Sequence, residues 1–424
     1  MFFVGEDVRM QKKAMGRGYH WVIVACCFLM IFSVMGFASA PRKLYMAVVP
    51  DALGIAYGPY SINDSIRYIS TAIANLLFGA LVLRFSPRKM IGTGFALVTA
   101  SMLVYSVAEG LPAVYIAGAL LGMGITFTGT TMSSYAVNLW CKKNKGTITG
   151  LVLCANGLGG ALATQMLSPL INASTFGYRN AYRLSAVLLA GIGVLVVLFF
   201  RNSPQAGEGV SSVSQKKARE GTWEGMTAAE AVRKPYFYAA AASIFLTGMV
   251  LQSIMGADAT HMARAGLDKA YATTILSIQS LALAGFKFLI GMLYDRQGLK
   301  RTMLICDGAA ILTMLMLIGI NDSLAGRAMA AAYSLLAAMA LPLETIMLPL
   351  ITAEIFGQKS FAQMLGIVSA INTAGYAMGP PITNFIFDAV GTYVPVFWAY
   401  MAVMAIVTAL FMYALLAVQR EKEK

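Results

Sequence analysis

The chain has 424 residues, of which 58% are hydrophobic and only 12% are charged, with a formal net charge of +13. Soluble domains carry about a quarter charged residues, so this composition excludes a soluble globular protein. The basic residues stand in short loops between apolar runs and not along one stripe, which excludes a nucleic-acid-binding surface. With two histidines and five cysteines that lack C-x-x-C spacing, we expect no metal site and no cofactor.

Apolar runs long enough to cross a bilayer core of about 30 Å recur along the whole chain. The first run is too long for the h-region of a signal peptide, so we expect it to remain as a membrane helix. The sequence therefore predicts an all-α integral membrane protein with twelve transmembrane helices. In chain order they cover residues 19–40, 61–83, 90–109, 113–139, 147–171, 179–200, 236–258, 270–294, 302–320, 326–352, 362–386 and 393–417.

The longest polar segment, residues 201–234, separates the sixth run from the seventh and has the composition of a linker. Inside it, Thr227 and Glu230 have the spacing of a capping box at the start of a short helix. We therefore expect a cytoplasmic linker between an N-terminal six-helix bundle over residues 1–200 and a C-terminal six-helix bundle over residues 235–424.

The lysines and arginines predict the orientation in the membrane. Most of the 32 lie at the termini, in the linker and in the loops on that same side. Because positive loops stay inside, both termini are predicted to be cytoplasmic, in a multi-pass protein of the cell (inner or plasma) membrane. We expect it to work as a monomer.

The two halves repeat each other after their second helices, at a half-chain period typical of transporters that rock one half against the other. The C-terminal copy reads G-x-x-x-D-R-x-G-x-K-R, and the N-terminal copy has Leu83 and Ser86 in place of the acid and the second glycine. We expect the copies to form a gating motif, with Asp295 carrying the gating role. Its candidate residues are Gly79, Arg84, Arg88, Gly291, Asp295, Arg296, Gly298 and Arg301.

This pattern resembles the signature loop of the major facilitator superfamily, and the resemblance covers the whole chain. It implies the major facilitator fold, in which two six-helix pseudo-repeats form a transporter and not an enzyme. The absence of clustered His-Glu or Cys-His residues agrees with that.

Shorter segments are similar to the monocarboxylate transporters and the bacterial oxalate/formate antiporters. They are the stretch from Gly36 to Lys43 and the entry to the fifth helix from Trp140 to Gly150. Those families place an arginine four residues before the signature glycine, where this chain has Lys287. The resemblance implies a small organic anion, a monocarboxylate or short dicarboxylate, moved by proton-coupled symport or anion exchange.

Lys287 and Glu344 are charges at membrane depth, each of which needs a reason because insertion costs roughly 3 kcal/mol. They lie about 12 Å and about 15 Å inside the basic face at 1.5 Å per residue. Lys287 either anchors a substrate carboxylate or forms a structural ion pair with Glu344. Glu344 stands between two prolines, where freed carbonyls are expected, and a buried carboxyl of this kind can load and release a proton.

Other polar residues complete the expected substrate path. Arg67 either pairs with Asp64, three residues earlier, or acts as an external gate or second anion contact. Arg42 and Lys43 either raise the anion concentration at the mouth or anchor the membrane interface. Three further side chains either bind the ligand or join neighbouring helices: Asn156, Asn372 and Tyr376.

Two other functions fit the same sequence. One is transport of a neutral or cationic solute, such as a drug or a sugar, with Lys287 held in a structural ion pair. The other is a membrane sensor that binds a solute without moving it, which the short tails disfavour.

Overall fold

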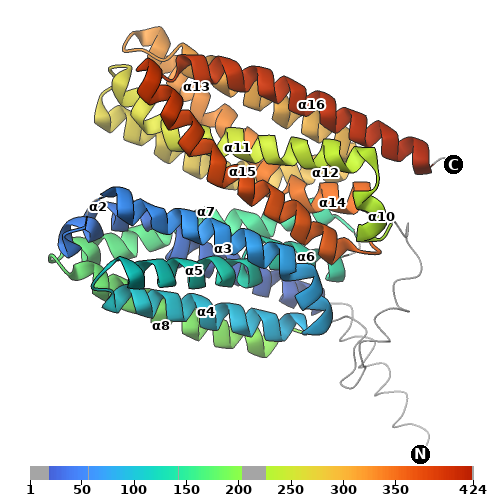
Figure 1. The fold of residues 1–424 in the computed structure, drawn as a ribbon, viewed down its shortest axis with the longest axis horizontal. Coiled ribbons are helices and arrows are strands. Elements are labelled where there is room, and N and C mark those ends of the chain that lie inside the picture. The colour runs from blue at the N-terminus through green and yellow to red at the C-terminus, as the bar shows by residue number, and fades with distance from the viewer. Residues whose placement is uncertain (1–18, 56, 142, 203–225, 423–424) are drawn as a thin grey trace, which may run out of the picture.

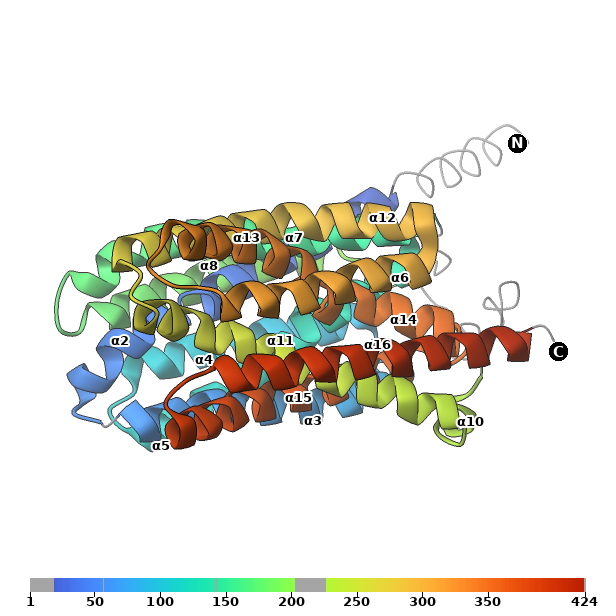
Figure 2. The same ribbon diagram turned by 90° about the horizontal axis from the view of Figure 1, so that it is seen from above.

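The computed structural model describes residues 19–55, 57–141, 143–202 and 226–422. The described chain is almost entirely helical and forms two bundles that lie side by side, one ending with α8 and the other beginning with α10 (Figure 1). Long helices run the length of both bundles (Figure 2). We call the end where the described chain begins at Tyr19 and stops at Lys422 the terminus end, and the opposite end the far end.

The first bundle holds six membrane crossings. The first starts at Tyr19 and continues through the π-helical turns η1, and the fourth is divided between α5 and α6 at Gly129. The helices are η1 (Ile31–Ser39), α2 (Arg42–Leu53), α3 (Tyr57–Arg84), α4 (Pro87–Val107), α5 (Leu111–Thr128), α6 (Thr130–Trp140), α7 (Lys145–Asn172) and α8 (Gly177–Phe199).

The second bundle holds six more crossings. Helix α12 supplies two of them, because Gly298 has a φ of 76° and reverses the chain at the terminus end. The elements are α10 (Ala228–Val232), α11 (Pro235–Arg264), α12 (Lys269–Ile318), α13 (Leu324–Ala340), the 3₁₀ turn η2 (Leu341–Glu344), α14 (Met347–Phe356), α15 (Phe361–Val390) and α16 (Val394–Lys422).

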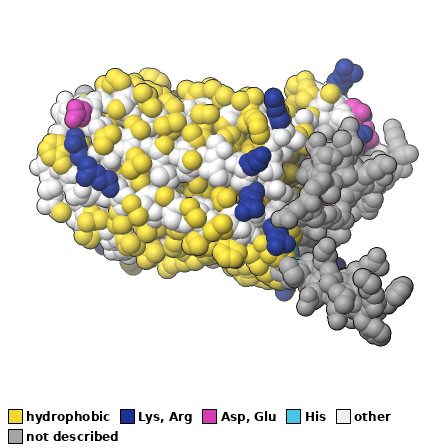
Figure 3. Space-filling model, turned by 90° about the horizontal axis from the view of Figure 1, so that it is seen from below, with side chains coloured by type: hydrophobic (Ala, Val, Ile, Leu, Met, Phe, Trp, Pro, Cys, Tyr) yellow, Lys and Arg dark blue, Asp and Glu magenta, His cyan; other side chains and the backbone are white. Residues whose placement is uncertain are grey.

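These helices confirm the prediction of an all-α membrane protein with twelve crossings. Among the described residues, ten helices are long and apolar enough to cross a membrane; the reversal in α12 and the 30-residue α15 complete the count. The space-filling view shows a hydrophobic middle, with basic side chains toward both ends (Figure 3). The predicted capping box is also present: Thr227 and Glu230 exchange hydrogen bonds of 2.7 and 3.3 Å, and these bonds lower the pKa of Glu230.

Two predicted boundaries were too simple. The first helix does not stop at residue 40, since α2 follows it at once as far as Leu53. The tenth is not continuous over residues 326–352, because the helix tightens into η2 at Pro342 and resumes only at Met347. Proline lacks the N–H that the helix ladder needs, so its carbonyl partners are freed at this point.

Close backbone packing joins the two bundles along α7 and α12. A Cβ atom on Gly150 would meet the backbone oxygen of Lys287, and Gly146 and Gly291 face each other in the same way nearer the terminus end. Only glycine permits this approach, as in other membrane helix pairs. The signature glycine Gly291 therefore has a packing function, and Lys287 lies on the surface where the two bundles meet.

Candidate functional site

Lys287 lies at the contact between α7 and α12 with its side chain 4% exposed. Within the described part of the chain, its ammonium makes no hydrogen bond and no ion pair; the ionisable groups that act on it are Glu344 and Cys154. A buried ammonium normally has a partner, because burying an unpaired charge is costly. This one is left with unused donors.

Glu344 closes the η2 turn and is 8% exposed. Its backbone carbonyl, freed by the interrupted helix, accepts a hydrogen bond of 3.4 Å from the side-chain amide of Asn372. Its carboxyl atom Oε1 is buried and without a hydrogen bond. The hydroxyl of Tyr376 and the ammonium of Lys287 interact electrostatically with this carboxyl. The ion pair between Lys287 and Glu344 that the sequence left open does not form between these two described residues.

Asn372 and Tyr376 stand one turn apart on α15 and face Glu344. Gly248 on α11 makes room for these two side chains, because a Cβ atom there would meet the Asn372 side-chain oxygen and the Tyr376 ring. That Asn372 oxygen is also buried without a hydrogen bond. The structure thus brings four predicted residues of the second bundle together around unused hydrogen-bonding atoms. Asn156 is half-buried on α7 and is not bonded to them.

Tyr68 on α3 connects this group to the first bundle. Its ring meets the ring of Tyr376 edge-on, with centroids 6.2 Å apart, and its hydroxyl accepts a hydrogen bond of 3.5 Å from Gln252 on α11. The guanidinium of Arg67 stacks over the same ring at 4.4 Å. Tyr68 therefore lies between the group around Glu344 and the arginines at the far end.

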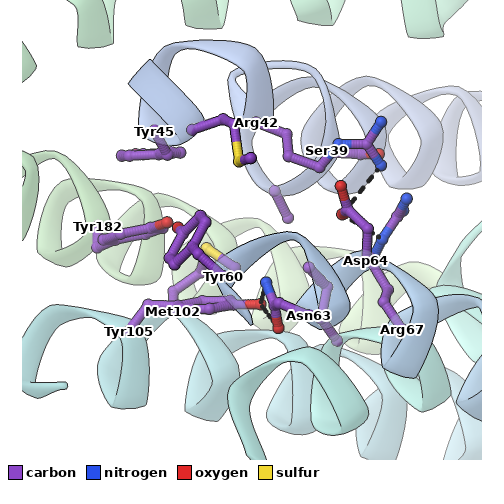
Figure 4. A pocket seen from close by; sticks show the side chains of 13 residues that line it. Ser39, Arg42, Tyr45, Tyr60, Asn63, Asp64, Arg67, Met102, Tyr105 and Tyr182 are labelled. Carbon is purple, nitrogen blue, oxygen red and sulfur yellow. Dashed lines mark hydrogen bonds and ion pairs between the residues drawn. The ribbon is translucent and has the colours of Figure 1, made fainter. Parts of the chain in front are cut away.

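Figure 4 shows the pocket at the far end of the first bundle. Asp64 forms ion pairs with Arg42 at 3.3 Å and with Arg67 at 3.6 Å, so the predicted pairing of Arg67 with Asp64 is present and is shared with Arg42. Tyrosines form the opposite wall, and the cavity has a volume of about 30 Å³. The Lys43 side chain lies outside the described residues.

At the terminus end, Asp295 of the predicted gating motif contacts the first bundle. Its two carboxylate oxygens accept hydrogen bonds of 2.9 and 2.7 Å from the backbone N–H groups of Gly146 and Thr147, at the positive N-terminus of α7. The acid is thus bound by backbone of the other bundle and not by the basic residues of its own loop.

The arginines of the motif do not cross between the bundles in the described structure. Arg88 bonds to Asn202 and to the carbonyl of Val197 at the end of α8. Arg84 lies near the ring of Phe85, and Arg296 and Arg301 are exposed. A latch built from arginine–carboxylate pairs is therefore absent among the described residues.

The family is decided by the whole-chain match. The family profile described as Major Facilitator Superfamily matches residues 21–262 and 240–424. The chain belongs to the Major Facilitator Superfamily. It is therefore a transporter and not an enzyme, in agreement with the expectation from the signature loop.

Several curated Major Facilitator Superfamily relatives transport organic acids, as their names state. The chain is 22% identical to the oxalate:formate antiporter of Oxalobacter formigenes, over 69% of this chain and 67% of that protein. It is 21% identical to the sialic acid transporter NanX of Escherichia coli, over 70% and 68%. It is 23% identical to the uncharacterized transporter YcxA of Bacillus subtilis, and spans about half of that protein (51% and 52%).

Solved structures share the Major Facilitator Superfamily fold. The proton:xylose symporter XylE superimposes with a TM-score of 0.74 at 13% identity, covering 95% of this chain and 96% of that chain. The E. coli fucose:proton symporter FucP gives 0.68 at 13% identity, covering 94% and 99%. At these identities the likeness establishes the fold alone.

Sequence reasoning missed two groups of residues that lie between the halves of this Major Facilitator Superfamily transporter. Tyr68 and Gln252 stand beside the predicted site but are common residues in apolar helices. At the terminus end, the Asn138 amide donates a hydrogen bond of 2.7 Å to Gln358, and Lys145 bonds to Asn138 at 2.6 Å. Apart from Lys145, these side chains are neutral and carry no large insertion cost, so no sequence signal marked them.

Proposed function

We propose that this transporter carries small organic anions, monocarboxylates or short dicarboxylates, by proton-coupled symport or anion exchange. The observation that supports it most is Lys287: an ammonium that is 4% exposed, at the contact between the bundles, without a hydrogen bond or ion pair in the described structure. A ligand carboxylate would supply the missing charge and acceptors.

The neighbours of Lys287 fit the same proposal. Glu344 is the proton-coupling group, with Tyr376 and Asn372 beside it to bind the other polar atoms of the ligand. Arg67, Arg42 and Lys43 draw anions to the far end, and Asn156 completes the path on α7. The halves move about the glycine-packed contact of α7 and α12, and Asp295 and the other motif residues hold the terminus end closed.

Three of the relatives support an acid as the substrate, since oxalate, formate, sialic acid and monocarboxylates all present a carboxylate. Transport of a neutral or cationic solute was the alternative for a Lys287 locked in an ion pair. The unpaired ammonium favours the anion.

The basic residues support a cell membrane orientation with both termini in the cytoplasm, so the terminus end would face the cytoplasm. The described arrangement, with that end closed by Asp295, would then be the state open or occluded toward the outside.

The test is counterflow in proteoliposomes with labelled formate, lactate, oxalate, malonate and, as neutral comparison, xylose, each at several pH values. Accumulation of at least one carboxylate and no accumulation of xylose is expected. Accumulation of xylose alone would exclude the anion function. Saturable binding without counterflow would indicate the sensor instead.

A further inference from the structure

The pocket at the far end holds one more positive charge than negative charge. Arg42 approaches from α2, and Asp64 and Arg67 lie one turn apart on α3 (Figure 4). Arg67 is only 7% exposed. A buried guanidinium that shares its one carboxylate with a second guanidinium is incompletely compensated. This pocket therefore keeps an excess of one positive charge.

The contacts of Asp64 are ion pairs without hydrogen bonds. Arg67 Nε and Asp64 Oδ1 are both buried and lack a hydrogen-bond partner, although a guanidinium has five donors in a planar fork that matches a carboxylate. The 3.3 and 3.6 Å separations are longer than a charge-assisted hydrogen bond of about 2.7–2.9 Å. Asp64 thus occupies the position of a bound carboxylate without making its best contacts.

Packed aromatic side chains fix one wall of this pocket. Tyr182 is stacked between Tyr45 and Tyr105, with centroid distances of 3.9 and 5.0 Å, and Tyr105 is fixed to Asn63 by hydrogen bonds of 2.8 and 3.0 Å. The cavity of about 30 Å³ holds one or two waters but not an organic acid. To contact both arginines in this conformation, an incoming carboxylate would therefore have to take the place of that of Asp64.

A chain of side-chain contacts joins the wall of this pocket to the group around Glu344. Arg67 stacks on Tyr68, the ring of Tyr68 contacts that of Tyr376, and Tyr376 acts on Glu344. These packed side chains lie between the two arginines and the group around Glu344. The two cationic positions are thus separate places in the fold, linked by side-chain contacts.

We propose that Arg42 and Arg67 form a second carboxylate-binding site, separate from Lys287, which Asp64 occupies as a tethered competitor until the carried acid displaces it. This rests on the proposed function, since the ligand is the same carboxylate. A tethered competitor acts at an effective concentration on the order of mM, so its removal tightens the site.

The test measures equilibrium binding of labelled oxalate and labelled lactate to purified protein in nanodiscs, in a Lys287→Gln background that removes the midplane anchor. We expect this protein to keep saturable binding of one of the probes. Adding Asp64→Asn should tighten that binding by about tenfold, and adding Arg67→Gln should weaken it by at least tenfold. Asp64→Glu is the matched control, because it keeps a tethered carboxylate and should leave affinity within about twofold.

Two results would overturn this site. The first is that the wild-type protein binds one of the two labelled acids while the Lys287→Gln protein binds neither. The second is that adding Asp64→Asn leaves the affinity for the labelled acid unchanged or weakens it. Should Asp64→Asn fail to give a monodisperse protein, Asp64→Ser replaces it with the same expected direction. Failure of the proposed function has a different signature, since the wild-type protein would then neither bind nor exchange any carboxylate.

Discussion

The side chains of Asn138 on α6 and Gln358, just after α14, join the two bundles through a hydrogen bond of 2.7 Å at the terminus end. The N-terminal copy of the gating motif has Leu83 where the C-terminal copy has Asp295, so it supplies no carboxylate to the start of α15. The amide pair stands at the same end as Asp295. Among the described residues, the side chains that bond the two bundles at this end thus include a charged one and a neutral pair.

Replacing Asp295 with asparagine is predicted to favour opening of the terminus end. A hydrogen bond to a charged group contributes about 1.5–3 kcal/mol, so its weakening should shift the closed-to-open ratio by roughly tenfold. Spin labels at the exposed positions Lys143 and Lys300, one in each bundle, would report a longer distance population by pulsed electron resonance. Asp388→Asn, an exposed carboxylate on α15, is the control; equal distance distributions for both variants would contradict the closing role of Asp295.

Neutralising Lys287 is predicted to abolish transport while the protein still inserts and purifies normally. Lys287→Gln removes the buried charge that the carboxylate needs, so counterflow should fall at least about a hundredfold, the effect of roughly 3 kcal/mol. Lys359→Gln, an exposed lysine of the second bundle outside the motif, should transport as the wild type does. Unchanged uptake by Lys287→Gln would exclude the anchor.

Glu344→Gln is predicted to flatten the pH dependence of transport. The carboxyl must bind a proton in each cycle, so symport by the wild type should fall as the pH rises, and glutamine cannot titrate. Rates measured from pH 5 to 9 in proteoliposomes would show it. Glu354→Gln, ten residues later and bonded to Tyr294, is the control, and a retained pH dependence in Glu344→Gln would exclude Glu344 as the coupling group.

Gly150→Ala is predicted to destabilise the closed protein and to slow transport. The added methyl would meet the backbone oxygen of Lys287, and overpacking of this kind costs about 1–3 kcal/mol. Gly285→Ala on α12 is the matched control, because nothing lies within 4 Å of the added carbon. Thermal unfolding in detergent should show a lower midpoint for Gly150→Ala alone; a midpoint equal to that of the control would mean that the helices are not in close contact here.

The fold could be predicted from the sequence because each membrane helix is recognisable by its length and apolar composition. The signature loop indicated the superfamily. Lys287 and Glu344 could be found for a related reason: a charge inside an apolar run is costly and conspicuous. The two prolines around Glu344 also predicted an interrupted helix, and the carbonyl of Glu344 there accepts a hydrogen bond from Asn372.

What the sequence did not predict depends on which helices meet. Tyr68 and Tyr376 are 308 positions apart and come together only through the packing of α3 on α15. The competition of Arg42 and Arg67 for Asp64 likewise requires α2 to fold over α3. No periodicity within a single helix encodes such contacts.

The hydrogen bonds of Asp295 have a consequence for sequence variation. Its acceptors contact only main-chain N–H groups, at Gly146 and Thr147, and every residue except proline carries such a donor. The hydrogen bond to Asp295 thus hardly depends on which side chain stands at position 147. We expect Thr147 to vary among homologues, whereas the carboxylate at position 295 is required. We therefore expect an alignment to show no covariation between positions 147 and 295, although the two residues are in contact.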